Sequence, residues 1–368
     1  MTTRGRIEGI DFWRGFALVS IFVNHGPDNL LGYLTHRNFG FSDAAEAFVF
    51  LSGVSVALAY GVRFLDGQVR DAIMALARRV FTLYWVQILI SLLAVAFLAS
   101  CVALLGDDGL MEDEDRDALL ESPLRGVVAI LGLTHQLAFF NILPLYIVLL
   151  LATPALLALA RRDRKLMLVA SAAIYIVARA FEINVPTWPN EGEWYFNPFA
   201  WQLLFAIGLY VGIDLKTAAP AANGKLFAAC LMFLLGSAFL VTNGFTFVPG
   251  LWDGTREALD VTKTDLGLLR LIHFLALSYA VFFSGVTRWL ATTPLFKPLS
   301  LIGRHSLPVF AAGSLLSTVD QVIIDTYAPA LMATVAIVAA GIAVQYIVAR
   351  YLAGQGARAR AADLQSIR

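Results

Sequence analysis

The sequence predicts an all-α, polytopic transmembrane bundle of about ten spanning helices. Of its 368 residues, 59% are hydrophobic and 15% are charged, whereas soluble domains contain about 45–50% apolar and about 25% charged residues. Several apolar runs reach the roughly 20 residues that a helix needs to cross a hydrocarbon core about 30 Å thick. These runs are continuous, which indicates helices, because the strands of a membrane barrel alternate in hydrophobicity.

The apolar runs define ten segments, and one of them is too long for a single crossing. Cytoplasmic loops are enriched in Lys and Arg, and basic loops follow the second and the fourth segments, with an acidic stretch at 106–121 between them. If that stretch lies outside, an odd number of crossings connects it to the basic loop at 161–165. We therefore expect one span at about 141–160, preceded by a shallow or re-entrant helix near 124–140 that lines a cavity. The ten segments are 12–26, 44–62, 80–104, 124–160, 166–182, 198–214, 226–242, 266–287, 299–322 and 328–350.

The same rule predicts that both termini lie in the cytoplasm, with 185–198 and 243–265 outside. The first apolar run is interrupted by Asp11 and Arg14 and is followed by no small-residue cleavage site, so we expect a retained helix and not a signal peptide. Residues 1–352 are expected to form a single transmembrane domain, and residues 353–368 a cytoplasmic basic tail. The inner side is also marked by basic residues between later segments, namely Lys216, Lys225, Arg288 and Lys297.

Composition excludes several classes of partner. The 27 basic and 27 acidic residues cancel, so the charge balance predicts no nucleic-acid partner. Cys101 and Cys230 lie inside apolar segments without metal-ligand spacing, so we expect neither a metal site nor a disulfide framework. The lipid bilayer is the partner that composition predicts, and the oligomeric state is left open.

The first helix carries two ionisable residues, Arg14 and His25, in RGFALVSIFVNH. They are eleven positions apart, which returns a helix to within about 20° of the same face and raises it by roughly 16 Å. Ionisable side chains inside a membrane are costly and mark functional sites. We therefore expect the two residues to line one wall at two depths.

Basic residues near the predicted inner surface suggest a binding site for an anionic ligand. The segment GRHSLPVF places Ser306 beside a predicted helix N-terminus, where backbone N–H groups and the helix dipole attract phosphate. Ordinary positive-inside orientation explains Arg78 and Arg79 equally well, but explains Arg14 less well. The expected set is Arg14, Arg78, Arg79, Arg304, His305 and Ser306.

Polar residues near the predicted outer surface form a second group. In FSDAAEAFVFLSG, Asp43 has N-cap chemistry, and Glu46 follows at a depth where its carboxylate is expected to orient His25. In KTDLGLLRLIHFLALSY, Lys263 and Asp265 are expected at the outer mouth, with Arg270 and His273 deeper on one face. A lone histidine inside a membrane helix is about as often a structural hydrogen-bonding residue as a catalytic one, so both roles stay open for His273. Trp194 belongs to an aromatic cluster that suits an interfacial belt or stacking against a sugar.

At these residues the sequence resembles the OpgC family, membrane succinyltransferases of osmoregulated periplasmic glucans within the wider acyltransferase-3-like membrane proteins. The likeness covers nearly the whole chain. Arg14 and His25 fit the pattern of Arg, ten residues and His that the wider superfamily shares, and FVFLSG matches the FVxLSG-like second-helix motif of that superfamily. The other segments that carry it are FNPFAWQLLFAIG, NILPLYIVLL, KTDLGLLRLIHFLALSY and IGRHSLPVF.

The resemblance implies a bacterial inner-membrane acyltransferase with an acyl-CoA donor on the cytoplasmic side and a glucan hydroxyl acceptor on the periplasmic side. His25 would be the catalytic histidine, and Arg14 would belong to the donor site. We expect succinyl-CoA as donor substrate and no tightly bound cofactor. From their placement, we expect Arg270 or His273 to stabilise the oxyanion, and Arg270 to bind the succinyl carboxylate.

Two alternatives remain open from the sequence. His25 is either a general base or a nucleophile that carries the acyl group. The residues alone are equally compatible with another acyl-CoA as donor and with another glycan or a lipid as acceptor. A protein of another class, a transporter of glycans or organic anions, also uses midplane ionisable residues. The sequence shows no internal repeat, which counts against a transporter.

Overall fold

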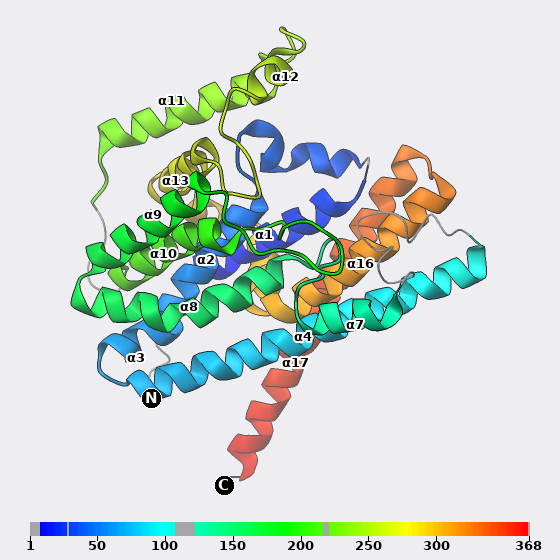
Figure 1. The fold of residues 1–368 in the computed structure, drawn as a ribbon, viewed down its shortest axis with the longest axis horizontal. Coiled ribbons are helices and arrows are strands. Elements are labelled where there is room, and N and C mark those ends of the chain that lie inside the picture. Colours follow the sequence, from blue (N-terminus) through cyan, green and yellow to red (C-terminus); the bar gives the residue numbers. More distant parts are fainter. Residues whose placement is uncertain (1–7, 28, 107–121, 216–220, 367–368) are drawn as a thin grey trace.

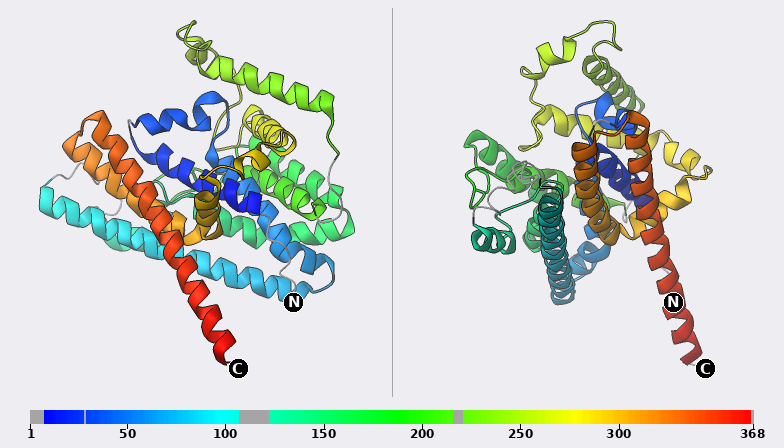
Figure 2. Two further views of the ribbon diagram at one scale, coloured as in Figure 1. Left: turned by 180° about the vertical axis from the view of Figure 1, so that it is seen from behind. Right: turned by 90° about the vertical axis from the view of Figure 1, so that its right-hand side faces the viewer.

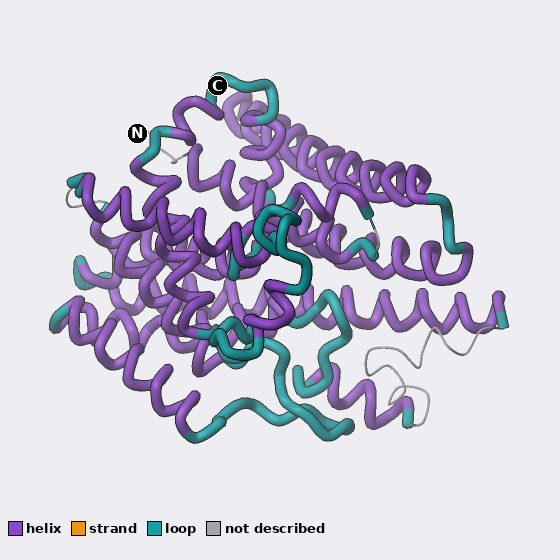
Figure 3. The backbone as a smooth tube through the Cα atoms, turned by 90° about the horizontal axis from the view of Figure 1, so that it is seen from above, coloured by secondary structure: helices purple, strands orange, loops and turns teal. Residues whose placement is uncertain are grey.

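The computed structural model describes residues 8–27, 29–106, 122–215 and 221–366, with the side chains of 359–366 left out. Within these ranges the elements are helices, and the extended backbone amounts to one isolated bridge between Pro186 and Glu193. Figure 3 shows the helices joined by loops that are mostly short. The all-α prediction is therefore confirmed for the described residues. The acidic stretch at 107–121, Arg4, Arg6 and Lys216 lie outside them, as do the side chains of the last basic residues.

Six helical stretches are long and apolar enough to cross a membrane, so the chain is an integral membrane protein. They are Ala44–Leu65 (α2 to α3), Val69–Leu105 (α4), Ile142–Arg162 (α8), Gly224–Val241 (α11), Ser306–Tyr327 (α16) and residues Leu331–Arg358 of α17 (Leu331–Ser366). The apolar helices Pro198–Asp214 (α10) and Leu268–Phe283 (α13) are shorter. The count of ten spans remains a prediction. The remaining α-helices are α1 (Glu8–His25), α7 (Pro123–Leu131), α9 (Arg164–Ala180), α12 (Leu251–Arg256), α14 (Val286–Leu290) and α15 (Phe296–Arg304), and two 3-10 helices, η1 (Leu30–Leu34) and η2 (His36–Phe39), lie between α1 and α2.

The long fourth segment divides near the predicted point, and α8 matches the span expected at about 141–160. The helix expected over 124–140 is shorter than predicted, because α7 ends at Leu131. Residues 132–141 between them form turns and loop, and Phe139 and Leu133 adopt positive φ angles of 68° and 60°. Backbone of this kind at membrane depth requires burial in protein or a polar cavity. The loop lines a cavity described below.

Two sequence-based boundaries were wrong. The segment expected at 299–322 is two helices, α15 and α16, because His305 leaves the helical conformation with φ −107° and ψ 37°. The third helix begins at Val69 and not near residue 80, so Arg78 and Arg79 lie within α4 and not in a loop. Apolar runs miss such a start because the first turns of α4 are amphipathic and carry charge.

Close packing of glycine backbones holds the centre of the bundle together. A Cβ at Gly53 of α2 would lie 2.3 Å from the Phe205 carbonyl oxygen, and one at Gly208 of α10 would lie 2.3 Å from that of Phe50. Helices approach this closely in membranes through small residues. The FVFLSG motif thus ends on a residue that fixes α2 against α10.

The same device joins α1 to α15. A Cβ at Gly303 would lie 1.8 Å from the Asp11 carbonyl oxygen, so no larger residue fits there. Figure 1 shows α1, α2 and α10 in the middle of the molecule, with α11 set apart from them. Figure 2 shows the C-terminal part of α17 projecting beyond the bundle. At one end of these central helices α1 stops and α2 and α8 begin, and the cavity described below lies at this end.

Candidate active site

A cavity of about 450 Å³ lies at this end of the bundle. Asn24 and His25, the last residues of α1, line it together with Asp43 at the start of α2. The loop before α8 and the loop at 187–196 supply further walls, and Arg37, Gln136, Asn141, Glu193, Trp194, Tyr195 and Lys263 are among its polar and aromatic lining residues. Its volume is that of a site for a small molecule or for one end of a larger one.

His25 is held between a hydroxyl and an aromatic ring. Its Nδ1 lies 3.4 Å from the Ser317 Oγ of α16, and its ring centre lies 4.5 Å from that of Phe139. Engaging Nδ1 leaves Nε2 as the nitrogen for a substrate. The charged side chains close enough to interact electrostatically with the imidazole are those of Lys263, Asp43 and Arg37.

Glu46 does not orient His25, which corrects the expectation from sequence. Its carboxylate is fully buried and accepts hydrogen bonds from Arg270 Nε and from the Asp43 backbone N–H, the latter at 2.8 Å. Asp43 Oδ1 in turn accepts from the Ala45 N–H at 2.8 Å. The two acids therefore form the capping box of α2.

Two cations balance these two carboxylates. Lys263 Nζ lies 2.6 Å from Asp43 Oδ2, and Arg270 Nη2 lies 2.8 Å from the same oxygen. Burial opposes ionisation of Asp43, but Lys263 and Arg270 outweigh it and hold the pKa of this carboxyl below its ordinary value. Asp43 is thus a carboxylate shared by the cavity and the buried ion-pair network.

Arg270 and His273, both expected to stabilise an oxyanion, are not among the residues that line the cavity. Arg270 is occupied by Glu46 and Asp43. His273 Nδ1 lies 2.8 Å from Ser42 Oγ, and a Cβ at Gly40 would lie 2.1 Å from its Nε2. The structure therefore places both side chains in the packing beneath the cavity.

The loop that carries Lys263 is anchored at both ends. Asp265 does not line the cavity, and its Oδ1 accepts a 2.8 Å hydrogen bond from Asn197, the N-cap of α10. Asp260 accepts hydrogen bonds from Arg179 at 2.7 and 2.8 Å, and from the Leu268 N–H at the start of α13. The hydrogen bonds from Arg179 hold the pKa of Asp260 below its ordinary value. These contacts fix the position of Lys263 in the cavity wall.

Trp194, predicted for an interfacial belt or for stacking against a sugar, lies in the wall of the cavity. It is 5% exposed, it lines the cavity, and its buried Nε1 has no hydrogen-bond partner. Lys263 Nζ lies 5.8 Å from the ring centre of the neighbouring Tyr195. An aromatic surface with an unused N–H donor is suited to a sugar hydroxyl.

At the other end of α1, Arg14 Nη2 donates to the Ser306 Oγ, where α16 begins. Arg14 and Arg79 both lie near enough to the Tyr146 hydroxyl of α8 to interact with it electrostatically. Of the predicted inner group, Arg14 and Ser306 are therefore in direct contact, and Arg79 lies on the same side of the bundle. Arg78 and Arg304 are exposed, and His305 is the residue between α15 and α16.

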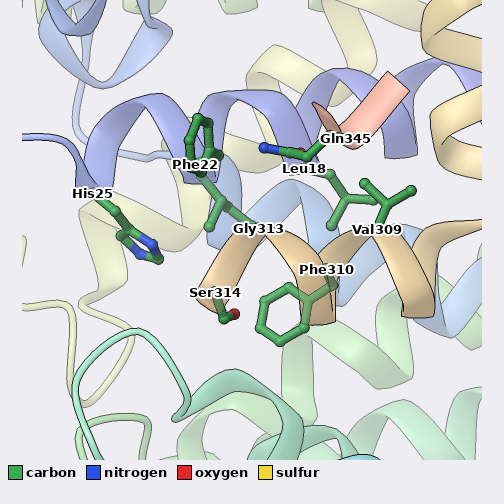
Figure 4. Close-up of a pocket in the computed structure, with 9 residues that line it drawn as sticks. Leu18, Phe22, His25, Val309, Phe310, Gly313, Ser314 and Gln345 are labelled. Atoms are coloured by element: carbon green, nitrogen blue, oxygen red, sulfur yellow. The ribbon is translucent and has the colours of Figure 1, made fainter. Parts of the chain in front are cut away.

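Helices α1 and α16 run side by side in the same direction. Arg14 contacts Ser306, and eleven residues further along both helices His25 contacts Ser317. Arg14 and His25 thus share a wall, as their spacing predicted. Between the two contacts lies a narrow pocket of about 10 Å³, lined by residues of α1 and α16 and by Gln345 of α17, and shown in Figure 4.

The comparison with protein families connects this geometry to a known group. The family model described as OpgC protein matches residues 6–355, nearly the whole chain. The chain belongs to the OpgC family. Membership in this family, together with the apolar helices, indicates a membrane acyltransferase that acts on a glycan. No curated protein and no solved structure matches the chain.

Several residues of the site escaped the sequence analysis. Ser317 repeats the spacing of His25 from Arg14 and was recognisable only once α16 was known to lie beside α1. Asn24, Arg37 and Gln136 come from the cavity walls and carry no pattern in sequence. Gln345 was detectable as a polar residue inside an apolar run.

Proposed function

We propose that this OpgC family member transfers a succinyl group from cytoplasmic succinyl-CoA to a hydroxyl of a periplasmic glucan in a bacterial inner membrane, with both termini cytoplasmic. The supporting observation is the parallel pair of α1 and α16, which joins a basic end at Arg14 and Ser306 to an imidazole in an open cavity at His25. The family match supports the reaction class. The direction across the membrane follows from the basic loops.

The phosphates of the donor bind near Arg14, Arg79 and the N-terminus of α16. Cations and the free N–H groups of a helix N-terminus both attract phosphate. The pantetheine arm of CoA extends along the wall between α1 and α16, over the roughly 16 Å that eleven helical residues rise. The space between the two contacts measures about 10 Å³, so the side chains that fill it have to move aside when the arm enters. The thioester carbonyl then reaches His25 at the floor of the cavity.

The acceptor glucan enters the cavity with a sugar against Trp194 and Tyr195. His25 Nε2 removes the proton of the attacking hydroxyl as its oxygen bonds to the thioester carbonyl carbon. The carbon–sulfur bond then breaks, and the imidazolium returns the proton to the CoA sulfur. Since Lys263 and Arg37 line the cavity and Arg270 does not, we assign the succinyl carboxylate to these two cations in place of Arg270.

The test uses the purified full-length chain in lipid nanodiscs with isotope-labelled succinyl-CoA and an unsubstituted glucan. We expect label on the glucan with the wild type and none with His25→Ala. Gly236→Ala is the control, because a Cβ at Gly236 meets nothing within 4 Å. Activity in His25→Ala would remove His25 from the mechanism.

The same assay separates the remaining alternatives. Acetyl-CoA in place of succinyl-CoA tests the donor, and label on His25 when the acceptor is omitted reveals a covalent acyl-histidine. A transporter leaves the acyl group on CoA under all of these conditions. That outcome would overturn the proposed function.

A further inference from the structure

The narrow pocket between α1, α16 and α17 contains a polar side chain that the mechanism has not used. Gln345 is 1% exposed, and its amide nitrogen has no hydrogen-bond partner. A buried amide without a partner is destabilising, because the N–H groups lose their hydrogen bonds to water and gain none in the protein. Gln345 lies within Leu331–Arg358, one of the six described stretches that are long and apolar enough to cross a membrane. Such a donor is a candidate for ligand binding where it faces a cavity, as Gln345 does.

The position of the amide is fixed by two close contacts between helices. One turn before Gln345, Gly341 lies against Phe22 of α1, where an added Cβ would come within 2.2 Å of the ring. Gly313 of α16 faces the amide itself, and a Cβ there would meet the Gln345 Cδ, Nε2 and Oε1 atoms at 3.5–3.6 Å. Figure 4 shows Gln345 reaching from α17 into the space between α1 and α16.

This pocket adjoins the proposed reaction centre. His25 lines both the pocket and the large cavity, as do Ile21 and Phe310. The pocket measures about 10 Å³, which is the space of a single small oxygen-bearing group. A thioester carbonyl carbon attacked beside His25 directs its oxygen away from the incoming hydroxyl. An oxygen-sized space containing a free N–H donor is what such a carbonyl requires.

We propose that the Gln345 amide donates a hydrogen bond to the carbonyl oxygen of the acyl thioester and stabilises the negative charge that forms there when the acceptor hydroxyl attacks. This inference rests on the proposed function. The amide supplies no proton and forms no covalent bond: the new carbon–oxygen bond forms as the hydroxyl proton moves to His25, and the carbon–sulfur bond breaks afterwards. Gln345 takes the role that the sequence had suggested for Arg270 or His273.

The test is Gln345→Met, which keeps the length of the side chain and removes both donors. We expect kcat to fall by about 10²–10³-fold, the effect of losing one oxyanion donor. The KM for succinyl-CoA stays within about threefold, because the interaction strengthens only in the transition state. A thioether analogue of succinyl-CoA, which lacks the carbonyl oxygen, inhibits the wild type and the variant equally.

Gln87→Met is the matched control. Gln87 is 2% exposed in α4, and its amide nitrogen donates to Ser91 Oγ at 3.2 Å. Its buried Oε1 has no hydrogen-bond partner, as is the case for Gln345 Nε2, but Gln87 lines neither pocket, so the pair of variants separates an unpartnered amide at the reaction centre from one elsewhere. We expect its kcat to stay within about threefold of the wild type. If Gln345→Met does not accumulate as folded protein, Gln345→Asn, which draws the amide back by one methylene, replaces it with the same expected fall in kcat.

Two results would overturn the inference while leaving the proposed function intact. One is an unchanged kcat in the folded Gln345 variant, which assigns the amide to packing or to a bound water. The other is a raised KM with unchanged kcat, which assigns it to ground-state binding. Failure of the wild type to transfer any acyl group refutes the proposed function itself, and the two failures are therefore distinguishable.

Discussion

Replacing Arg270 with methionine tests whether the ion-pair network is a structural support beneath the cavity. The substitution keeps an unbranched apolar stem and removes the guanidinium that binds Glu46 Oε1 and Asp43 Oδ2. Glu46 has no exposed surface, so its carboxylate loses its charge partner where water does not replace it. Breaking a buried pair in this way costs about 3–5 kcal/mol.

A double-mutant cycle with Glu46→Gln isolates the interaction between the two side chains. Neutralising Glu46 first removes the unpaired charge, so Arg270→Met in that background costs less, and the coupling energy falls in the range of about 0.5–3 kcal/mol. Ser171→Ala in α9 is the reference substitution for this cycle, because Ser171 is not part of the network formed by Glu46, Arg270 and Asp43.

The assay is unfolding of the purified protein in mixed micelles, followed by circular dichroism and repeated in the refolding direction. A loss below about 1 kcal/mol for Arg270→Met would refute the argument. So would a double variant whose loss equals the sum of the two single losses within the roughly 0.5 kcal/mol error of additivity.

Two further predictions concern packing and pH. Gly53→Ala places a methyl group 2.3 Å from the Phe205 carbonyl oxygen, and we expect it to lower the free energy of unfolding by about 1–3 kcal/mol in the same assay. Gly236→Ala is the control and should be neutral, because a Cβ there has nothing within 4 Å. Equal stability of the two variants would contradict the packing argument. Because hydrogen bonds from Arg179 lower the pKa of Asp260 in the folded state, its contribution to stability is present above the ordinary carboxyl pKa of about 4 and is lost as the pH falls through the lower folded value. The stability advantage of the wild type over Asp260→Asn is therefore full at neutral pH and disappears in acid, and an advantage that persists unchanged at low pH would refute this.

Patterns within one helix were readable from the sequence, and contacts between helices were not. The eleven-residue spacing placed Arg14 and His25 on one wall, and the basic loops correctly divided residues 124–160, because both signals depend on local geometry and charge. The prediction that Glu46 contacts His25 was wrong, because the predicted depth of Glu46 was compatible with either His25 or Arg270 as its partner. Only the packing of α13 against α2 decides between the two.

The boundaries failed where the chain departs from simple apolar runs. The apolar run 299–322 passed over the break at His305, although GRHSLPVF had predicted a helix N-terminus beside Ser306, and α16 does begin at Ser306. Ser317 and Gln345 gain meaning only from the helices that face them. Roles for the site residues remain predictions, whereas their positions follow from the structure.

The two contacts between α1 and α16 are eleven residues apart on both helices, and this equal spacing limits how the two helices can move relative to each other. Sliding one helix past the other breaks the Arg14 contact and the His25 contact together, so the two ends of the pair are locked in step. A rocking motion of the kind that alternates access in carriers would have to split this pair along its whole length. Under the proposed function, the seal between the two sides of the membrane is therefore formed by the side chains that fill the space between the contacts, and the donor is expected to enter by displacing these side chains and not by separating the two helices.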